Sequence, residues 1–263
     1  MSAVASGGAT ANAAAMAAFL KLDVSEIALL LDFDGTLVDI AATPDAVHVP
    51  DDLCESLAQL LALTSGALAI VSGRPIRDID AKFAPLKLPV VGGHGAEMRV
   101  GDDEVVSAVT PLPDELRRRL KVAAAFDPGI VIEDKGYSVA LHYRRAPAVA
   151  PRLNAHIEAV CADFPGEPIE MLPGKALFEI KRPGVSKGEG VRALLTHAPF
   201  AGRTPVFIGD DETDKTLFAL LPEFGGVGFS VDLEYEGLAG MFESPAAVRS
   251  ALKRLASAAA ARR

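Results

Sequence analysis

Two aspartates, Asp32 and Asp34, lie two positions apart directly after a short apolar run. If the extended backbone continues through Phe33, both carboxylates point to one side of the chain and into one pocket. One carboxylate of such a pair can attack phosphorus, while the other protonates the leaving alcohol and later takes a proton from water. Aspartate before glycine is also a common turn residue, so the pair alone leaves a structural role open.

A second acidic group, formed by Asp210, Asp211 and Asp214, follows another apolar run. Carboxylates this close repel one another unless a cation compensates them, and a set of oxygen ligands favours Mg²⁺. Asp210 comes where the apolar run ends and is therefore the best candidate for a metal ligand. Asp211 and Asp214 have an alternative role, because either could cap the helix that is predicted to begin near Thr213.

Lys187 and Ser72 are candidate phosphate ligands. Lys187 opens a predicted helix, where the helix dipole disfavours a cation. The position makes sense if the side chain faces a phosphate and the aspartate pair, whose charge it would neutralise in the transition state. Ser72 offers a hydroxyl and neighbouring backbone N–H groups to the same phosphate, although Ser-Gly is also typical of an ordinary turn.

Three apolar runs carry these polar clusters at their ends, namely Ile27–Leu31, Leu68–Val71 and Val206–Ile208. Each run is continuous rather than alternating, which is typical of strands buried on both faces of a parallel sheet. Helical patterns lie between and after the runs, over residues 50–64, 187–197, 213–221 and 245–259. In such an α/β fold the carboxyl ends of the parallel strands lie along one edge, where ligands bind. The sequence therefore predicts that the polar clusters converge.

Residues 109–183 have a different pattern, in which helices alternate with strand-like stretches and a Pro-Gly pair ends the last one. This pattern indicates a small α+β domain inserted into the larger domain, which then comprises residues 25–108 and 184–263. Residues 1–24 form an Ala-rich lead-in that we expect to be weakly helical or frayed. We expect the insert to close over the larger domain through hinges near Thr110–Pro113 and Pro183–Ser186.

Composition and charge exclude several classes of protein. Hydrophobic residues make up 50% and charged residues 23%, which is typical of a globular chain, and no apolar stretch has the roughly 18 residues of a membrane span. The net charge of −9 disfavours nucleic-acid binding. Cys54 and Cys161 have no metal-ligand spacing, and no basic residue precedes Lys21 as in a secretory signal. We therefore expect a soluble cytoplasmic protein without nucleic-acid or membrane partners.

Four motifs, taken in order along the chain, resemble those of the haloacid dehalogenase (HAD) superfamily of phosphatases. They are Asp32-Phe33-Asp34-Gly35-Thr36-Leu37, Ser72, Lys187 and Gly209-Asp210-Asp211-x-x-Asp214. The resemblance implies a Rossmann-like HAD core with a parallel sheet and helices on both faces. The insert lies where that superfamily carries its C2-type cap, so an α+β cap domain is also implied.

The same resemblance implies a role for each motif residue. Asp32 is the expected nucleophile, Asp34 the general acid/base, and Ser72 and Lys187 the phosphate ligands. Mg²⁺ is expected to bind to Asp32, to the backbone carbonyl of Asp34 and to Asp210. The residues expected to support the metal or Lys187 are Asp211 and Asp214.

A closer resemblance, spanning both predicted domains, is to the trehalose-6-phosphate phosphatases. It rests on these stretches: Ser72-Gly73-Arg74, Gly93-His94-Gly95-Ala96-Glu97-x-Arg99, Glu133-Asp134-Lys135, His142-Tyr143-Arg144 and Gly174-Lys175-x-x-x-Glu179. In that family two cap glutamates and a lysine hold the sugar hydroxyls. The implied substrate-binding residues here are Arg74, His94, Glu97, Glu133, Arg144, Lys175 and Glu179. The chain departs from the family at Lys215, where an acidic residue is common, and we expect this side chain to face solvent.

The resemblance thus implies an Mg²⁺-dependent phosphatase that hydrolyses trehalose 6-phosphate through an aspartyl-phosphate, with a functional link to trehalose-6-phosphate synthase. A disaccharide phosphate offers many hydroxyls, so its site needs mixed hydrogen-bond donors and acceptors, which the predicted insert residues supply. One alternative is another sugar phosphatase, acting on sucrose 6-phosphate or mannosylglycerate phosphate. A phosphomutase and a catalytically silent sugar-phosphate sensor are further alternatives.

Overall fold

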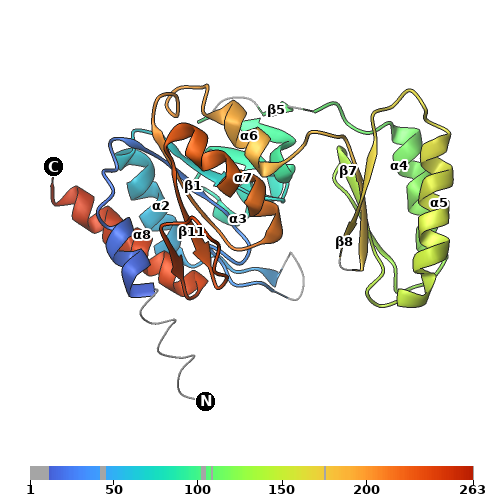
Figure 1. Ribbon diagram of the computed structural model, residues 1–263, viewed down its shortest axis with the longest axis horizontal. Coiled ribbons are helices and arrows are strands. Elements are labelled where there is room, and N and C mark those ends of the chain that lie inside the picture. Colours follow the sequence, from blue (N-terminus) through green and yellow to red (C-terminus); the bar gives the residue numbers. More distant parts are fainter. Residues whose placement is uncertain (1–11, 42–45, 102–104, 108, 175, 263) are drawn as a thin grey trace, which may run out of the picture. The chain divides into compact units, whose positions relative to one another are not determined.

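The structure is a computed structural model that describes residues 12–41, 46–101, 105–107, 109–174 and 176–262. The chain divides into two compact units (Figure 1). The core unit comprises Met1–Val106 and Ser186–Arg263, and the insert unit comprises Ser107–Val185. Each unit has its own sheet and its own hydrophobic core.

The core unit contains an 8-stranded sheet in the order β12-β11-β10-β1-β2-β3-β4-β5. The strands are β1 (Ile27–Leu31), β2 (Leu68–Val71), β3 (Val90–Gly92), β4 (Glu97–Arg99), β5 (Val106–Ser107), β10 (Thr204–Gly209), β11 (Val227–Val231) and β12 (Gly240–Phe242). Neighbours from β12 to β3 pair in parallel, while β4 pairs antiparallel to β3. The predicted runs at β1, β2 and β10 are therefore central strands.

Helices cover both faces of this sheet, as the alternation of buried side chains in β1 shows. Leu29 and Leu31 belong to the core cluster formed with α2, α3 and α8, whereas Ala28 and Leu30 belong to the cluster formed with α6 and α7. The helices are α2 (Asp51–Leu63), α3 (Ile76–Phe83), α6 (Lys187–Leu194), α7 (Lys215–Leu220) and α8 (Pro245–Ala260). This arrangement confirms the predicted α/β class with helices on both faces.

The N-terminal segment contributes to this core. Residues 12–19 are helical, and Ala15 and Phe19 are fully buried. The ring of Phe19 packs edge-on against Phe229 and Phe242, with centroids 5.5 and 5.9 Å apart. The segment that we expected to be weakly helical or frayed is thus, over these residues, a packed helix beside β11 and β12. Residues 1–11 of that predicted lead-in lie outside the described residues.

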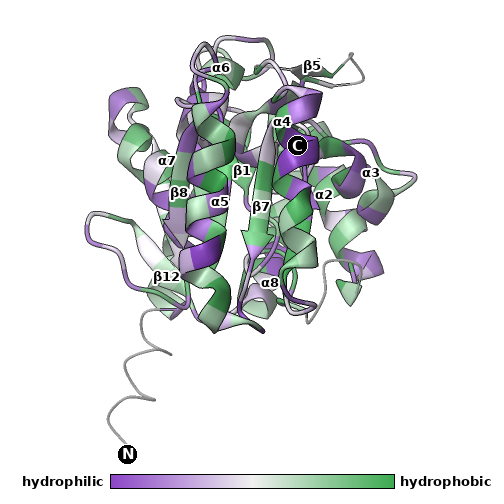
Figure 2. Ribbon diagram, turned by 90° about the vertical axis from the view of Figure 1, so that its right-hand side faces the viewer, coloured by the Kyte–Doolittle hydropathy of each residue, from purple (hydrophilic) through white to green (hydrophobic). Residues whose placement is uncertain are grey.

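The insert unit is a 4-stranded antiparallel sheet in the order β6-β7-β9-β8 with two helices on one face. Its elements are α4 (Asp114–Lys121), β6 (Val131–Asp134), β7 (Ser138–His142), α5 (Ala150–Ala162), β8 (Glu170–Gly174) and β9 (Leu177–Lys181). Alternate residues of β7 and β9, such as Val139 and Ile180, pack against Leu116 of α4 and Leu153 of α5. In Figure 2, α4 and α5 carry both hydrophilic and hydrophobic stretches, as amphipathic helices do.

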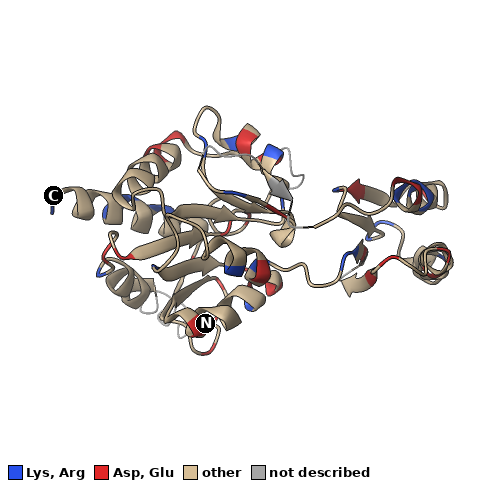
Figure 3. Cartoon of the chain, turned by 90° about the horizontal axis from the view of Figure 1, so that it is seen from above, with Lys and Arg blue, Asp and Glu red and all other residues tan. Residues whose placement is uncertain are grey.

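Charged residues lie mainly on the helices and loops, whereas the central strands carry almost none (Figure 3). Among the described residues, no helix is both long and apolar enough to span a bilayer.

Candidate active site

The residues expected to do chemistry lie at the carboxyl edge of the core sheet. Asp32 follows β1 and Asp210 follows β10, and these strands are parallel neighbours with Leu31 opposite Ile208. The backbone N–H of Asp32 donates to the carbonyl of Ile208 (2.9 Å), so the ladder extends to Asp32 itself. Ser72 follows β2 on the other side of β1. The predicted convergence of the strand ends is therefore present.

Lys187, the first residue of α6, lies between two carboxylates. Its Nζ is 2.8 Å from Oδ1 of Asp32 and 2.7 Å from Oδ1 of Asp214. All three residues are buried. Burial disfavours the charged lysine, but the attraction of the two carboxylates is stronger and raises its pKa above the usual value, so the ammonium group stays charged. The cation at a helix start is explained by these anionic partners.

One lysine does not compensate the buried acids around it. Burial raises the pKa of Asp32 to about 7, although Lys187 opposes the shift. Burial and the nearby Asp32 raise the pKa of Asp214 to about 8, and burial also raises that of Asp210. Each shift means that the ionised carboxylate lacks stabilising positive charge. The site therefore has the electrostatic properties of one that takes up a further cation.

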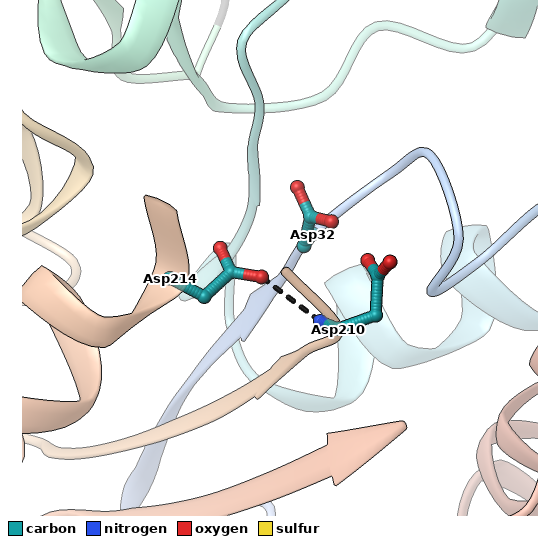
Figure 4. A group of neighbouring side chains, drawn as sticks. All are labelled: Asp32, Asp210 and Asp214. Atoms are coloured by element: carbon teal, nitrogen blue, oxygen red, sulfur yellow. Dashed lines mark hydrogen bonds between the residues drawn. The ribbon is translucent and has the colours of Figure 1, made fainter. Parts of the chain in front are cut away.

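Oxygen atoms of Asp32, Asp210 and Asp214 lie within 4.8 Å of one another (Figure 4). Asp214 is already occupied, because its Oδ1 accepts from Lys187 and its Oδ2 accepts from the backbone N–H groups of Asp210 and Asp211 (2.9 and 3.0 Å). Asp32 and Asp210 have fewer donors than Asp214, namely Lys187 on Oδ1 of Asp32 and the shared hydroxyl of Thr36, so this pair is the better candidate for a metal site. Hard carboxylate oxygens of this kind fit Mg²⁺, and Asp214 fixes the loop that carries Asp210.

Two residues of the first motif, for which we made no separate prediction, complete this cluster. Buried Thr36 donates from Oγ1 to Oδ1 of Asp210 (2.9 Å) and lies 3.3 Å from Oδ2 of Asp32. Gly35 has φ +83°, and a Cβ there would lie 2.2 Å from Oδ2 of Asp210. Glycine is thus needed both for the backbone conformation and for the close approach of the carboxylate. Gly35 and Thr36 could have been predicted as site residues from the sequence, because they directly follow Asp34.

Asp34 has a partner of its own. Arg74 donates from Nε to Oδ2 of Asp34 (2.6 Å) and from Nη2 to Oδ1 (2.7 Å), which is a two-point contact that fixes the carboxylate plane. The guanidinium also lies 5.3 Å from the centroid of the Phe33 ring. Arg74 was expected to bind substrate, and in this structure it holds the expected general acid/base.

The loop after β10 is held by its own side chains. Oδ1 of Asp211 accepts from the backbone N–H groups of Thr213 and Asp214 (2.9 and 3.2 Å), so the capping role weighed from the sequence is present at Asp211. Asp211 also lies 3.8 Å from Lys187 Nζ. The Nζ of Lys215, half-exposed as expected, pairs with Glu212 at 2.7 Å.

The remaining core residues predicted to bind substrate lie beside Ser72. The carbonyl of Ser72 accepts from the N–H of His94 (3.0 Å), and His94 has φ +56°. A Cβ on Gly73 would lie 2.4 Å from Nε2 of His94, so this imidazole lies against the Ser72 loop. Glu97 accepts from the N–H of Ile76 (2.8 Å) and thereby holds the start of α3. Ser72 is 1% exposed.

The predicted sugar-binding residues of the insert unit lie mainly on its strands. Glu133 of β6 and Glu179 of β9 both pair with Ala140 of β7, so they occupy one row on the face opposite α4 and α5. Arg144 is exposed in the loop after β7. Lys175 lies outside the described residues. The structure thus brings the two glutamates together on one face.

Comparison with protein families places this chain among known phosphatases. The model of the trehalose-phosphatase family matches residues 30–235. The trehalose-6-phosphate phosphatase of Escherichia coli is 39% identical over 211 residues, which cover 79% of this chain and 78% of that protein. A probable trehalose-phosphate phosphatase of Sinorhizobium fredii is 42% identical over 214 residues, covering 81% and 80% of the two chains.

Solved structures show the same fold. The C-terminal domain of the C. albicans trehalose-6-phosphate phosphatase aligns with a TM-score of 0.69 at 23% identity, covering 94% of this chain and 96% of that one. A trehalose-6-phosphate phosphatase related protein aligns with a TM-score of 0.71 at 24% identity, covering 90% and 100%.

Proposed function

The chain belongs to the trehalose-phosphatase family and is a phosphatase, and we propose that it hydrolyses trehalose 6-phosphate to trehalose and phosphate through an aspartyl-phosphate. The observation that carries this proposal is the buried Asp32, held by Lys187 and adjacent to Asp210 at the carboxyl edge of the sheet. The names of the curated relatives support the choice of sugar phosphate.

In the first step, a carboxylate oxygen of Asp32 attacks phosphorus, and the bond from phosphorus to the sugar oxygen breaks. Protonated Asp34 gives its proton to that oxygen, so trehalose leaves as a neutral alcohol. In the second step, water attacks the aspartyl-phosphate, the bond from phosphorus to Asp32 breaks, and Asp34 takes the proton from water. The two-point contact with Arg74 holds the ionised carboxylate in place, so Asp34 must release part of this contact when it carries the proton.

In this proposal, Lys187 and Ser72 bind the phosphate group. Lys187 keeps Asp32 oriented from a distance of 2.8 Å and offsets negative charge as the phosphorus is attacked. Ser72 presents a hydroxyl beside its own loop N–H groups.

We propose that Mg²⁺ is held by Asp32, the backbone carbonyl of Asp34 and Asp210. The raised pKa values of Asp32 and Asp210 and the oxygen-only donor set support this assignment. When bound, the ion supplies positive charge that draws the phosphate group to the carboxylates and lowers the charge repulsion between them. Asp211 and Asp214 support the ion through the loop that they brace.

The insert unit, in this proposal, is a cap domain that recognises the sugar. Glu133 and Glu179 accept hydrogen bonds from sugar hydroxyls, and Lys175 and Arg144 add donors. Hydroxyl recognition of this kind discriminates between disaccharides, because a misplaced hydroxyl leaves a carboxylate without its partner.

The proposal is tested by measuring phosphate release from trehalose 6-phosphate, sucrose 6-phosphate and mannosylglycerate phosphate with Mg²⁺ present. We expect the highest kcat/KM with trehalose 6-phosphate. Faster turnover of another sugar phosphate would replace the substrate assignment. Transfer of the phosphate to a second sugar without free phosphate would indicate a phosphomutase, and binding without turnover would indicate a sensor.

A further inference from the structure

Arg182 is a buried arginine that the proposed mechanism does not use. It follows β9 directly, and only 8% of the residue is exposed. Its guanidinium donates to four acceptors, which use most of its five N–H groups. Three of the acceptors are backbone carbonyls, so the side chain does more than form one ion pair.

The acceptors come from chain segments far apart in the sequence. Nε donates to the carbonyl of Thr110 (3.2 Å), and Nη2 donates to that of Pro111 (3.0 Å). Nη1 donates to the carboxylate of Glu167 (2.5 Å) and lies 3.4 Å from the carbonyl of Pro168. The chain enters the insert unit at Ser107, three residues before Thr110, and leaves it at Val185, three residues after Arg182. One side chain therefore ties the incoming and outgoing segments of this unit together.

The outgoing segment connects two regions that the proposed function uses. Glu179 lies three residues before Arg182, on the sheet face expected to bind sugar, and Lys187 lies five residues after it. Between them, Gly184 has φ +75° with no atom within 4 Å of a Cβ position. Nζ of Lys181 also donates to the carbonyl of Val185 (2.7 Å). This bond spans Gly184, so the segment is fastened on both sides of the glycine.

We propose that Arg182 is a positioning residue for hydrolysis of the sugar phosphate, an inference that rests on the proposed function. By holding Thr110 and Pro111 against the end of β9, it makes both connections one rigid base for the sugar-binding sheet. Thr110 and Pro111, which belong to one of the expected hinges, are thereby hydrogen-bonded within the insert unit. This base keeps the end of β9, three residues after Glu179, in the geometry that sugar recognition on the sheet face needs.

The test compares Arg182→Met with Arg182→Lys and with the control Arg118→Met. Arg118 is an exposed arginine of α4 that pairs with Glu115. Each variant is assayed with trehalose 6-phosphate and with p-nitrophenyl phosphate, which has no sugar. We expect Arg182→Met to lower kcat/KM for the sugar phosphate by about 100-fold, the typical cost of a small misplacement of reacting groups. The aryl phosphate rate and the control variant should match wild type, and Arg182→Lys should recover part of the loss.

Hydrogen–deuterium exchange gives a readout that does not depend on activity. In Arg182→Met, we expect faster exchange at the amides of Leu112 and Glu167, which are hydrogen-bonded to Gly136 and Phe164. Amides of β7 and β9 should keep their protection. Glu167→Gln, which removes the charge from one anchor and leaves Arg182 in place, should show the same changes to a smaller extent.

Two results would overturn the role of Arg182. One is an unchanged ratio of kcat/KM between the two substrates, whether both values fall equally or neither falls, and the other is loss of protection throughout the insert unit, which would indicate a merely structural residue. A wild-type enzyme without activity on trehalose 6-phosphate would overturn the proposed function instead. In that case, local exchange at Leu112 and Glu167 would still test the rigid base.

Discussion

The carboxylates of the core unit and those of the insert unit are held in different ways. Asp32 and Asp214 are almost fully buried, with hydrogen bonds or ion pairs to Lys187 and to backbone N–H groups. Glu133 and Glu179 stand half-exposed on a regular antiparallel sheet. Burying a charge is costly and requires specific partners, whereas placing one on an open sheet face costs little. The core arrangement is therefore suited to reaction chemistry and the insert arrangement to recognition.

The comparison predicts its largest effect at Asp32. Asp32→Asn removes the proposed nucleophile, so kcat with any phosphate ester should fall by at least about 10⁴-fold. Phosphate release with trehalose 6-phosphate and with p-nitrophenyl phosphate measures this loss. The control is Asp163→Asn, which changes an exposed carboxylate paired with Arg119 and should leave both rates unaltered. Residual turnover close to wild type in Asp32→Asn would contradict the covalent mechanism.

Asp34 should have a smaller effect that depends on the leaving group. Asp34→Asn removes the proton donor, and loss of general acid/base catalysis typically costs about 10²–10⁴-fold. p-Nitrophenolate leaves without a proton, so its release should be slowed less than that of trehalose in single-turnover experiments. Equal slowing of both leaving groups would show that Asp34 does not protonate the sugar oxygen.

Substitutions on the sheet of the insert unit should lower activity on the sugar phosphate without changing activity on a phosphate ester that has no sugar. Glu133→Gln and Glu179→Gln each weaken a charged hydrogen bond to a sugar hydroxyl, worth about 1.5 kcal/mol, so kcat/KM for trehalose 6-phosphate should fall roughly tenfold. Turnover of p-nitrophenyl phosphate should not change. Glu158→Gln, an exposed glutamate of α5 paired with Asn154, is the matched control. Should the aryl phosphate rate fall in parallel, the division between chemistry and recognition would be wrong.

The smallest expected effect concerns stability and pH in protein treated with EDTA. The pKa values of Asp32 and Asp214 are raised to about 7 and about 8 from 3.8, so the folded state binds these protons more tightly than the unfolded state. Stability therefore falls as pH rises from about 4 to about 8. The raised pKa of Lys187 adds no slope in this window, because the lysine is charged in both states.

Melting curves recorded at pH 5 and pH 8 measure this dependence. Tm should be lower at pH 8, added Mg²⁺ should raise it more at pH 8 than at pH 5, and Asp32→Asn should flatten the profile. A Tm that rises with pH in wild type but not in Asp32→Asn would contradict the raised pKa of Asp32 in the folded state.

The central strands and the convergence of their ends were predictable, because the continuous apolar runs at β1, β2 and β10 indicate buried parallel strands without reference to the rest of the chain. Helix α3 was not predicted. Its 8 residues include Arg77, Asp78, Asp80 and Lys82, and its first N–H is held by Glu97 from a distant strand. The three-residue strand β12 likewise depends on pairing with β11 rather than on its own sequence.

Within the candidate site, residue types were predictable and partners were not. The motif spacing indicated Asp32, Asp34 and Lys187, but the contact between Arg74 and Asp34 joins loops 40 positions apart and needs the folded sheet. The burial of Phe19 was missed for a similar reason, since the Ala-rich segment has little apolar periodicity before it meets β11 and β12.

The strand order has a consequence for how the chain folds during synthesis. β10, the parallel neighbour of β1 at the centre of the sheet, is made only after the whole insert unit has been translated. On the ribosome, the insert unit can complete its own antiparallel sheet while β1 still has one edge uncovered. A nascent chain arrested before Thr204 should thus carry a folded insert and an open apolar edge, the state in which chaperones would engage it.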